Sequence, residues 1–116
     1  MVSPICQRLL NKIWRQYDLD DVPHIKGIYV IGITVPLDVP EVLYVGRTND
    51  MHRRMAEHKP KHLAIDEFVK QQFELNDGED LRIKWVHERN DNHREREYRE
   101  CTAKKLGYWP KYNIQD

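Results

Sequence analysis

The apolar residues of this chain recur with two different periods, and the change of period predicts alternating helices and strands. Near the N-terminus they return at every fourth position, at Ile5, Leu9, Ile13 and Tyr17. This spacing predicts a helix over residues 3–17. Residues 26–35 and 42–46 are rich in β-branched side chains, which favours two strands joined as a hairpin through a proline-bounded loop.

Further helices and one more strand are predicted after this hairpin. The helices are expected over residues 50–59, 61–75 and 90–106. Residues 81–88 alternate apolar and basic side chains, as is typical of a half-buried strand. The order of elements predicts an α+β fold, with a small three-stranded antiparallel or mixed sheet flanked by helices and an extra N-terminal helix.

The length and composition favour one globular domain. The chain has 116 residues, of which 40% are hydrophobic and 33% are charged. We expect residues 1–25 to form a helical extension of a main unit over residues 26–116. We also expect no membrane span and no signal peptide, and a cytoplasmic or nuclear protein. Cys6 and Cys101 lack metal or pairing spacing, so reduced thiols are expected.

The net charge is zero, with 19 basic and 19 acidic residues, so any surface for nucleic acid must be local. Five basic residues gather between residues 47 and 62: Arg47, Arg53, Arg54, Lys59 and Lys61. The same segment holds two acidic residues, Asp50 and Glu57, which leaves a local charge of 5 − 2 = +3. This segment is either a solvated helix face or a candidate nucleic-acid contact surface.

One arginine of this segment falls on the apolar face of its helix. Arg54 shares that face with Met51, Met55 and His58. Tyr29 and Tyr44 lie in the two strands of the hairpin and can approach each other across it. These side chains are either a cross-strand aromatic pair beside a snorkelling arginine, or a functional cluster. Burying a guanidinium without a partner is unfavourable, which favours the cluster.

The order and spacing of these residues resemble the GIY-YIG nucleases. The matching positions are Gly27-Ile28-Tyr29, Tyr44-Val45-Gly46, Arg54, His58 and Asn113. The resemblance extends from Lys26 to Ile114 and implies that fold, with hydrolysis of DNA phosphodiester bonds assisted by Mg²⁺ or Mn²⁺. The alternative is a non-catalytic nucleic-acid-binding or adaptor domain with the same fold. With no appended DNA-reading module expected, DNA specificity would come from the N-terminal helix, a homodimer or a partner protein.

The resemblance also implies roles for individual residues. Tyr29 and Tyr44 would act as base or positioning groups, and Arg54 would contact the phosphate. His58 would assist proton transfer and Asn113 would close the site. Arg47, Arg53, Lys59 and Lys61 remain the candidates for nucleic-acid contact.

The metal ligand implied by the resemblance is one glutamate of the last helix. Glu100, Glu97 and Glu95 lie 13, 16 and 18 residues before Asn113, and we favour them in that order. At least two of these glutamates are expected to be solvent carboxylates in helical ion pairs. A zinc site at His52, His58 and His62 is a weaker alternative, because no fourth ligand is evident and Pro60 interrupts the helix.

Overall fold

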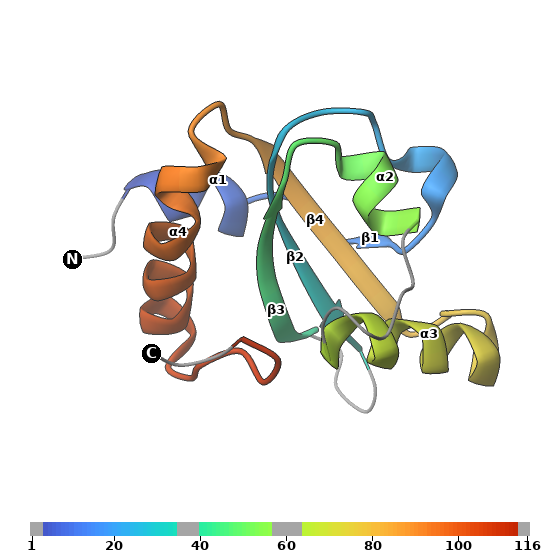
Figure 1. Cartoon of the computed structure of the whole chain (residues 1–116). Helices are drawn as coiled ribbons and strands as arrows, with labels where there is room; N and C mark the ends of the chain where they lie inside the picture. Colours follow the sequence, from blue (N-terminus) through green and yellow to red (C-terminus); the bar gives the residue numbers. More distant parts are fainter. Residues whose placement is uncertain (1–3, 35–39, 57–63, 114–116) are drawn as a thin grey trace.

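The computed structural model describes residues 4–34, 40–56 and 64–113, which form a four-stranded sheet with helices on both faces (Figure 1). The strands lie in the order β1-β4-β2-β3, and all neighbours are antiparallel. Their bounds are β1 Arg15–Gln16, β2 Gly27–Ile33, β3 Glu41–Thr48 and β4 Leu81–His87. The helices are α1 Pro4–Leu10, the 3₁₀ turn η1 Leu19–Asp21, α2 Met51–Ala56, α3 Ala64–Asn76 and α4 Asp91–Leu106. The α+β class is therefore confirmed, but the sheet has four strands rather than three.

The fourth strand arises because the N-terminal helix is shorter than expected. Helix α1 ends at Leu10, and β1 pairs with β4, with Arg15 opposite Ile83. Ile13, which the four-residue spacing placed on a buried helix face, is 83% exposed. Tyr17 is buried through tertiary contacts instead, because its hydroxyl donates to the carbonyl of Met55 at 2.8 Å. The prediction of one helix over residues 3–17 was wrong, since tertiary packing outweighed a local periodicity.

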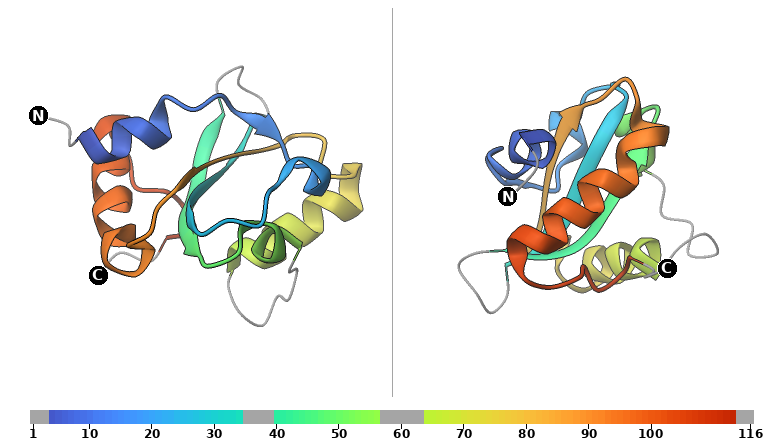
Figure 2. Two further views of the ribbon diagram at one scale, coloured as in Figure 1. Left: turned by 90° about the horizontal axis from the view of Figure 1, so that it is seen from above. Right: turned by 90° about the vertical axis from the view of Figure 1, so that its left-hand side faces the viewer.

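The helices divide between the two faces of the sheet. Helices α1 and α4 cover one face, and α2 and α3 lie on the other, as two further views show (Figure 2). Alternate residues of β2 enter the two resulting cores: Tyr29 and Ile31 on the α2–α3 side, and Ile28 and Val30 on the α1–α4 side. A strand that is covered on both faces carries apolar residues at consecutive positions, which explains the sequence of β2.

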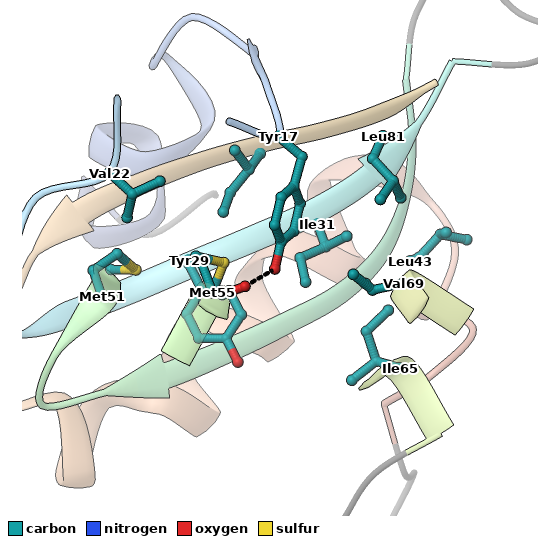
Figure 3. Packing of buried hydrophobic residues seen from close by; sticks show 11 residues of the cluster. Tyr17, Val22, Tyr29, Ile31, Leu43, Met51, Met55, Ile65, Val69 and Leu81 are labelled. Carbon is teal, nitrogen blue, oxygen red and sulfur yellow. Dashed lines mark hydrogen bonds between the residues drawn. The ribbon is translucent and has the colours of Figure 1, made fainter. Parts of the chain in front are cut away.

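The core on the α2–α3 side positions the short helix α2. Met51 and Met55 lie one turn apart and are almost fully buried, beside Tyr29, as Figure 3 shows. The backbone N–H of Met51 donates to the carbonyl of Ile25 at 2.7 Å, which ties the start of α2 to the chain before β2. This anchoring fixes the direction in which the rest of α2 projects.

The C-terminal tail lies along the outer edge of β3. The amide N–H of Tyr112 donates to the carbonyl of Leu43, and the Tyr108 hydroxyl accepts from the N–H of Val42. Asn113 forms two side-chain hydrogen bonds with the backbone of Val45, at 2.8 and 2.9 Å. The edge strand therefore has partners for its backbone groups without a fifth strand.

The oxidation state of Cys101, in helix α4, differs from the expectation. Cys101 is disulfide-bonded, so the expected reduced thiol is wrong for this residue. The only other cysteine of the sequence is Cys6, whose side chain lies outside the part that the structure describes. Among the described residues, no helix is long and apolar enough to cross a membrane.

Candidate active site

The two motif tyrosines face each other across a glycine. In the antiparallel pairing of β2 with β3, Tyr29 lies opposite Gly46 and Ile31 lies opposite Tyr44. The rings of Tyr29 and Tyr44 are 6.0 Å apart between centroids, at an angle of 42°. A Cβ atom on Gly46 would lie 2.5 Å from the Tyr44 ring and 2.6 Å from the Tyr29 ring and hydroxyl. Glycine at this position therefore lets both tyrosines occupy the same face.

These tyrosines line a surface pocket that four elements build together. The pocket has a volume of about 320 Å³ and is lined by Tyr29, Tyr44, Arg47, Thr48, Asn49, Arg53, Arg54 and Glu95. Its walls come from β2, the end of β3, α2 and the first turns of α4. Three arginines and one carboxylate give the lining a net positive charge, which suits an anionic ligand.

The side chain of Arg54 points into the protein because it forms an ion pair with a buried carboxylate. Its guanidinium lies 2.7 Å from Asp66 of α3, and the two side chains are 17% and 7% exposed. Burial lowers the pKa of Arg54, but the tyrosines and Asp66 raise it more, so the net change is upward and the side chain stays charged. This ion pair joins α2 to α3 and fixes the guanidinium at the pocket.

Burial also keeps both tyrosines in their neutral form. It raises the pKa of Tyr29 well above its ordinary value, and the neighbouring Tyr44 raises it further. The pKa of Tyr44 is raised by burial and by the carboxylate of Glu95, against smaller opposing effects of Arg54 and a hydrogen bond with Tyr29. In the protein by itself, the two hydroxyls are therefore available to orient a bound group through hydrogen bonds, and their phenolate forms are disfavoured.

The three candidate glutamates occupy different faces of α4. Glu95 lines the pocket, and its side chain is 27% exposed. Glu100 is 56% exposed and pairs with Arg96 at 2.8 Å, and Glu97 is also exposed. Neither of them is among the residues that line the pocket. The structure thus places Glu95, the glutamate that the sequence ranked last, in the pocket with the tyrosines and Arg54. The two glutamates that the sequence favoured lie outside the pocket lining.

Asn113 is close to the tyrosine strand but does not line the pocket. Both polar atoms of its amide are engaged by the backbone of Val45, between Tyr44 and Gly46 in sequence. This contact holds the strand that carries Tyr44, which is a positioning function. A direct role in closing the site stays a prediction.

The basic candidates divide between described and undescribed parts of the chain. Arg47 lines the pocket and lies 3.4 Å from Asp91, a carboxylate that is 1% exposed at the start of α4. Arg53 also lines the pocket and donates to the side chain of Asn49. His58, Lys59 and Lys61 lie outside the described residues, and so does His62 of the zinc alternative. Among the described residues, no group of three or more potential metal ligands occurs.

Sequence reasoning missed Asp66, although a signal for it exists. Asp66 lies between Ile65 and Val69, which are both buried, so it falls on the apolar side of its helix. Arg54 occupies the corresponding position on the preceding helix. Opposite charges on the apolar faces of consecutive helices are the pattern expected of a buried ion pair.

Comparison with known proteins adds no family assignment. No protein-family model matches the chain, and no curated protein and no solved structure matches it either. The likeness to the GIY-YIG nucleases therefore rests on the residues quoted above, of which Tyr29, Tyr44 and Arg54 line the pocket.

Proposed function

We propose that this protein is a divalent-metal-dependent endonuclease that hydrolyses phosphodiester bonds in DNA, with a site of the GIY-YIG kind. The observation that carries the proposal is the shared pocket of Tyr29, Tyr44, Arg54 and Glu95. These residues are far apart in the sequence and come from separate strands and helices. Their types supply hydrogen-bond donors, a fixed cation and an oxygen ligand, which phosphodiester hydrolysis requires.

Arg54 supports the proposal through its geometry. A planar guanidinium binds phosphate oxygens through paired hydrogen bonds, and it is useful in catalysis when its position is fixed beforehand. Asp66 provides that fixation at 2.7 Å, from outside the pocket lining. Arg47 and Arg53 add positive charge at the same pocket, where a DNA backbone would pass.

The donor set fits a magnesium or manganese ion held by Glu95. Mg²⁺ prefers oxygen ligands and is commonly bound by one or two carboxylates together with water and substrate phosphate. The negative charge of Glu95 reaches the pocket, as its effect in raising the pKa of Tyr44 indicates. When bound, such an ion would act as a Lewis acid toward a phosphate oxygen.

The tyrosines serve as positioning groups in this proposal. Because burial disfavours their phenolate forms, we assign them the orientation of the attacking water and the phosphate through their hydroxyls. A role as general base would require a further positive charge near the hydroxyls, in addition to Arg54.

A second candidate is a nucleic-acid-binding module without catalysis. The raised pKa values of both tyrosines favour it, because the resting protein then has no ready base at Tyr29 or Tyr44. Such a module would bind DNA through the same arginines and would not depend on Glu95.

The two candidates are separated by nicking of supercoiled plasmid with Mg²⁺, with Mn²⁺ and with chelator. Glu95→Gln and Glu100→Gln form a matched pair, since each removes one charge from α4 and one helical ion pair with an arginine. We expect Glu95→Gln to lower the nicking rate about 100-fold, as loss of a metal ligand or its support does, and Glu100→Gln to leave it unchanged. Binding of DNA by wild type without nicking in either metal would establish the second candidate instead.

A further inference from the structure

Two histidine rings lie against each other outside the tyrosine pocket. His24 belongs to the segment before β2, and His52 belongs to the first turn of α2. Their ring centroids are 4.4 Å apart, and the ring planes are inclined by 33°. Neither residue lines the tyrosine pocket, so the proposed nuclease makes no use of this contact.

The backbone around the two histidines is held together by hydrogen bonds. The N–H of His52 donates to the carbonyl of Pro23 at 3.0 Å, and the N–H of Met51 donates to the carbonyl of Ile25 at 2.7 Å. These bonds fix the start of α2 against the residues on either side of His24. The fold therefore brings the two imidazoles together before any ligand binds.

Hydrogen bonds also determine which nitrogen of each ring carries the proton. Nδ1 of His24 lies 2.9 Å from the carboxylate of Asp50, and Nδ1 of His52 lies 2.8 Å from the carbonyl of Val22. An ionised carboxylate and a carbonyl oxygen can only accept hydrogen bonds, so both Nδ1 atoms must be donors. In a neutral imidazole the lone pair then lies on Nε2.

The two Nε2 atoms are available to a metal ion. Within the described part of the chain, neither forms a hydrogen bond with another residue. The side chain of His24 is 67% exposed, so an ion can reach it from solvent and its ring can turn toward that ion. Metal-binding histidines commonly donate the other ring N–H to a carboxylate or a backbone carbonyl, as both of these rings do.

We propose that His24 and His52 bind one zinc ion, or another transition-metal ion that prefers nitrogen ligands, through their Nε2 atoms. Zn–N bonds are about 2.0–2.1 Å long, so two imidazoles that share an ion must lie close together, as these rings do. The described residues supply no group of three ligands, so water completes the coordination. Asp50 and the carbonyl of Val22 hold the rings without touching the ion.

This ion differs in kind and in position from the Mg²⁺ or Mn²⁺ assigned to Glu95. Mg²⁺ prefers oxygen ligands, whereas imidazole suits zinc, copper and nickel. An ion at the histidines would link the start of α2 to the segment before β2. It would stabilise the folded protein, because the unfolded chain does not hold the two rings side by side.

The test is a calorimetric titration with Zn²⁺ in excess Mg²⁺, which occupies sites made of oxygen ligands. His24→Gln/His52→Gln removes the proposed ligands, and His87→Gln/His93→Gln removes two exposed histidines elsewhere as a matched control. We expect the control to bind zinc as tightly as wild type, and the first pair to bind it more weakly by about tenfold or more. No saturable binding to wild type, or equal weakening by both pairs, would overturn the proposal.

His24→Gln by itself separates this site from a zinc site at His52, His58 and His62, the alternative that the sequence raised. Because His24 is mostly exposed, its replacement should leave the fold intact. We expect this single change to weaken zinc binding. If it leaves the affinity unchanged and His58→Gln/His62→Gln abolishes binding, the alternative holds and the proposal is wrong.

Asp50→Asn tests how the ligand His24 is positioned. An asparagine oxygen can still accept the hydrogen bond that the N–H of Arg53 donates to Asp50, so the cap of α2 is kept, but the charge that orients the imidazole is lost. We expect zinc affinity to fall by about 10-fold to 100-fold. An unchanged affinity would contradict the role assigned to Asp50.

Glu95→Gln separates this proposal from the nuclease. We expect it to leave the zinc affinity unchanged, because Glu95 lines the other pocket. Weakening equal to that of His24→Gln/His52→Gln would place the zinc at the tyrosine pocket and overturn the proposal. The titration needs no cleavage, so the nuclease proposal can fail while this one stands.

Discussion

The tyrosine pocket and a second pocket near the N-terminal segment, lined by Asn11, Lys12, Ile13, Arg15, Lys84 and Trp85, both contain cations, but the cations are held in different ways. Arg54 and Arg47 each lie beside a buried carboxylate, Asp66 at 2.7 Å and Asp91 at 3.4 Å. Lys84 has only a backbone carbonyl and an aromatic ring as partners among the described residues. A paired cation is held in a fixed geometry, whereas an unpaired buried cation retains affinity for an added anion.

The difference concerns how firmly each cation is held before any ligand binds. Reaction chemistry depends on groups held in place before the substrate arrives, which the Arg54–Asp66 pair provides. Lys84 has no such carboxylate among the described residues, so no ion pair fixes the position of its charge. Substitutions in the two pockets should therefore have very different effects on stability.

The largest effect is expected from Asp66→Ala. It leaves the guanidinium of Arg54 buried without its carboxylate, and loss of one partner of a buried pair lowers the free energy of unfolding by about 3–5 kcal/mol. Urea unfolding measures this loss. The exposed pair of Arg96 and Glu100 supplies the control, since Glu100→Ala should change stability by less than about 1 kcal/mol.

A second variant tests whether the loss comes from the uncompensated charge. Replacing both partners, as Arg54→Met/Asp66→Leu, removes the charges together and should restore most of the stability lost in Asp66→Ala. If the double variant is as unstable as Asp66→Ala, the loss comes from packing at α3, and the contrast between the pockets would not rest on charge pairing.

An intermediate effect is expected from Gly46→Ala. The new methyl group would meet the rings of Tyr29 and Tyr44 at 2.5–2.6 Å, so at least one ring must move. Overpacking of this kind lowers stability by about 1–3 kcal/mol, and near-UV circular dichroism should report the displaced tyrosines. Nicking by the variant should fall as well.

Gly107→Ala is the control for the loss of a glycine. Its Cβ would meet no atom within 4 Å, but its φ of +84° is unfavourable for alanine. We expect a loss of about 1 kcal/mol from backbone strain, with unchanged tyrosine signals. If Gly46→Ala behaves in the same way as this control, the close approach of the two tyrosines is not what requires glycine at position 46.

The smallest effect is expected from Lys84→Met. The variant loses the hydrogen bond to Leu10 and the contact with Trp14, but it also removes a desolvated charge. These effects oppose each other, so we expect the stability at pH 7 to stay within about 1 kcal/mol of wild type. A loss of several kcal/mol would show that Lys84 is a structural cation after all, and the two pockets would then be alike.

The difference in stability between wild type and Lys84→Met should also depend on pH, in a direction that follows from the shifted pKa of Lys84. Because the pKa of Lys84 is lower in the folded protein than the unfolded value of about 10.4, folding favours loss of its proton. The penalty for burying the charge is complete below the folded pKa and disappears as the pH rises toward 10.4. Wild type should therefore gain stability relative to Lys84→Met between pH 7 and pH 10.5, measured by urea unfolding.

Local pattern and motif spacing predicted much of this molecule. The hairpin of β2 and β3, the last strand β4 and the helix α4 occur where the sequence placed them, because their periodicity agrees with their burial. The motif tyrosines and Arg54 also meet in one pocket as expected. These features depend on neighbours in sequence or on a single antiparallel pairing.

The remaining features depend on contacts that no local pattern encodes. Strand β1 exists because β4 offers an edge to Arg15 and Gln16, although the apolar spacing continues a helix through them. Whether Glu95 or Glu100 lines the pocket depends on how α4 is rotated against β3, which distance from Asn113 along the chain does not determine. Asp66 was missed because its pairing with Arg54 becomes evident only when α3 is placed beside α2.

The C-terminal tail on β3 has a consequence for association between molecules. An open edge strand presents unpaired backbone groups that a strand from another copy can join, which is a common route to aggregation. Here Tyr108, Tyr112 and Asn113 already engage the backbone of Val42, Leu43 and Val45. A second copy would first have to displace the tail, so the sheet is protected from growing at the edge nearest the tyrosine pocket.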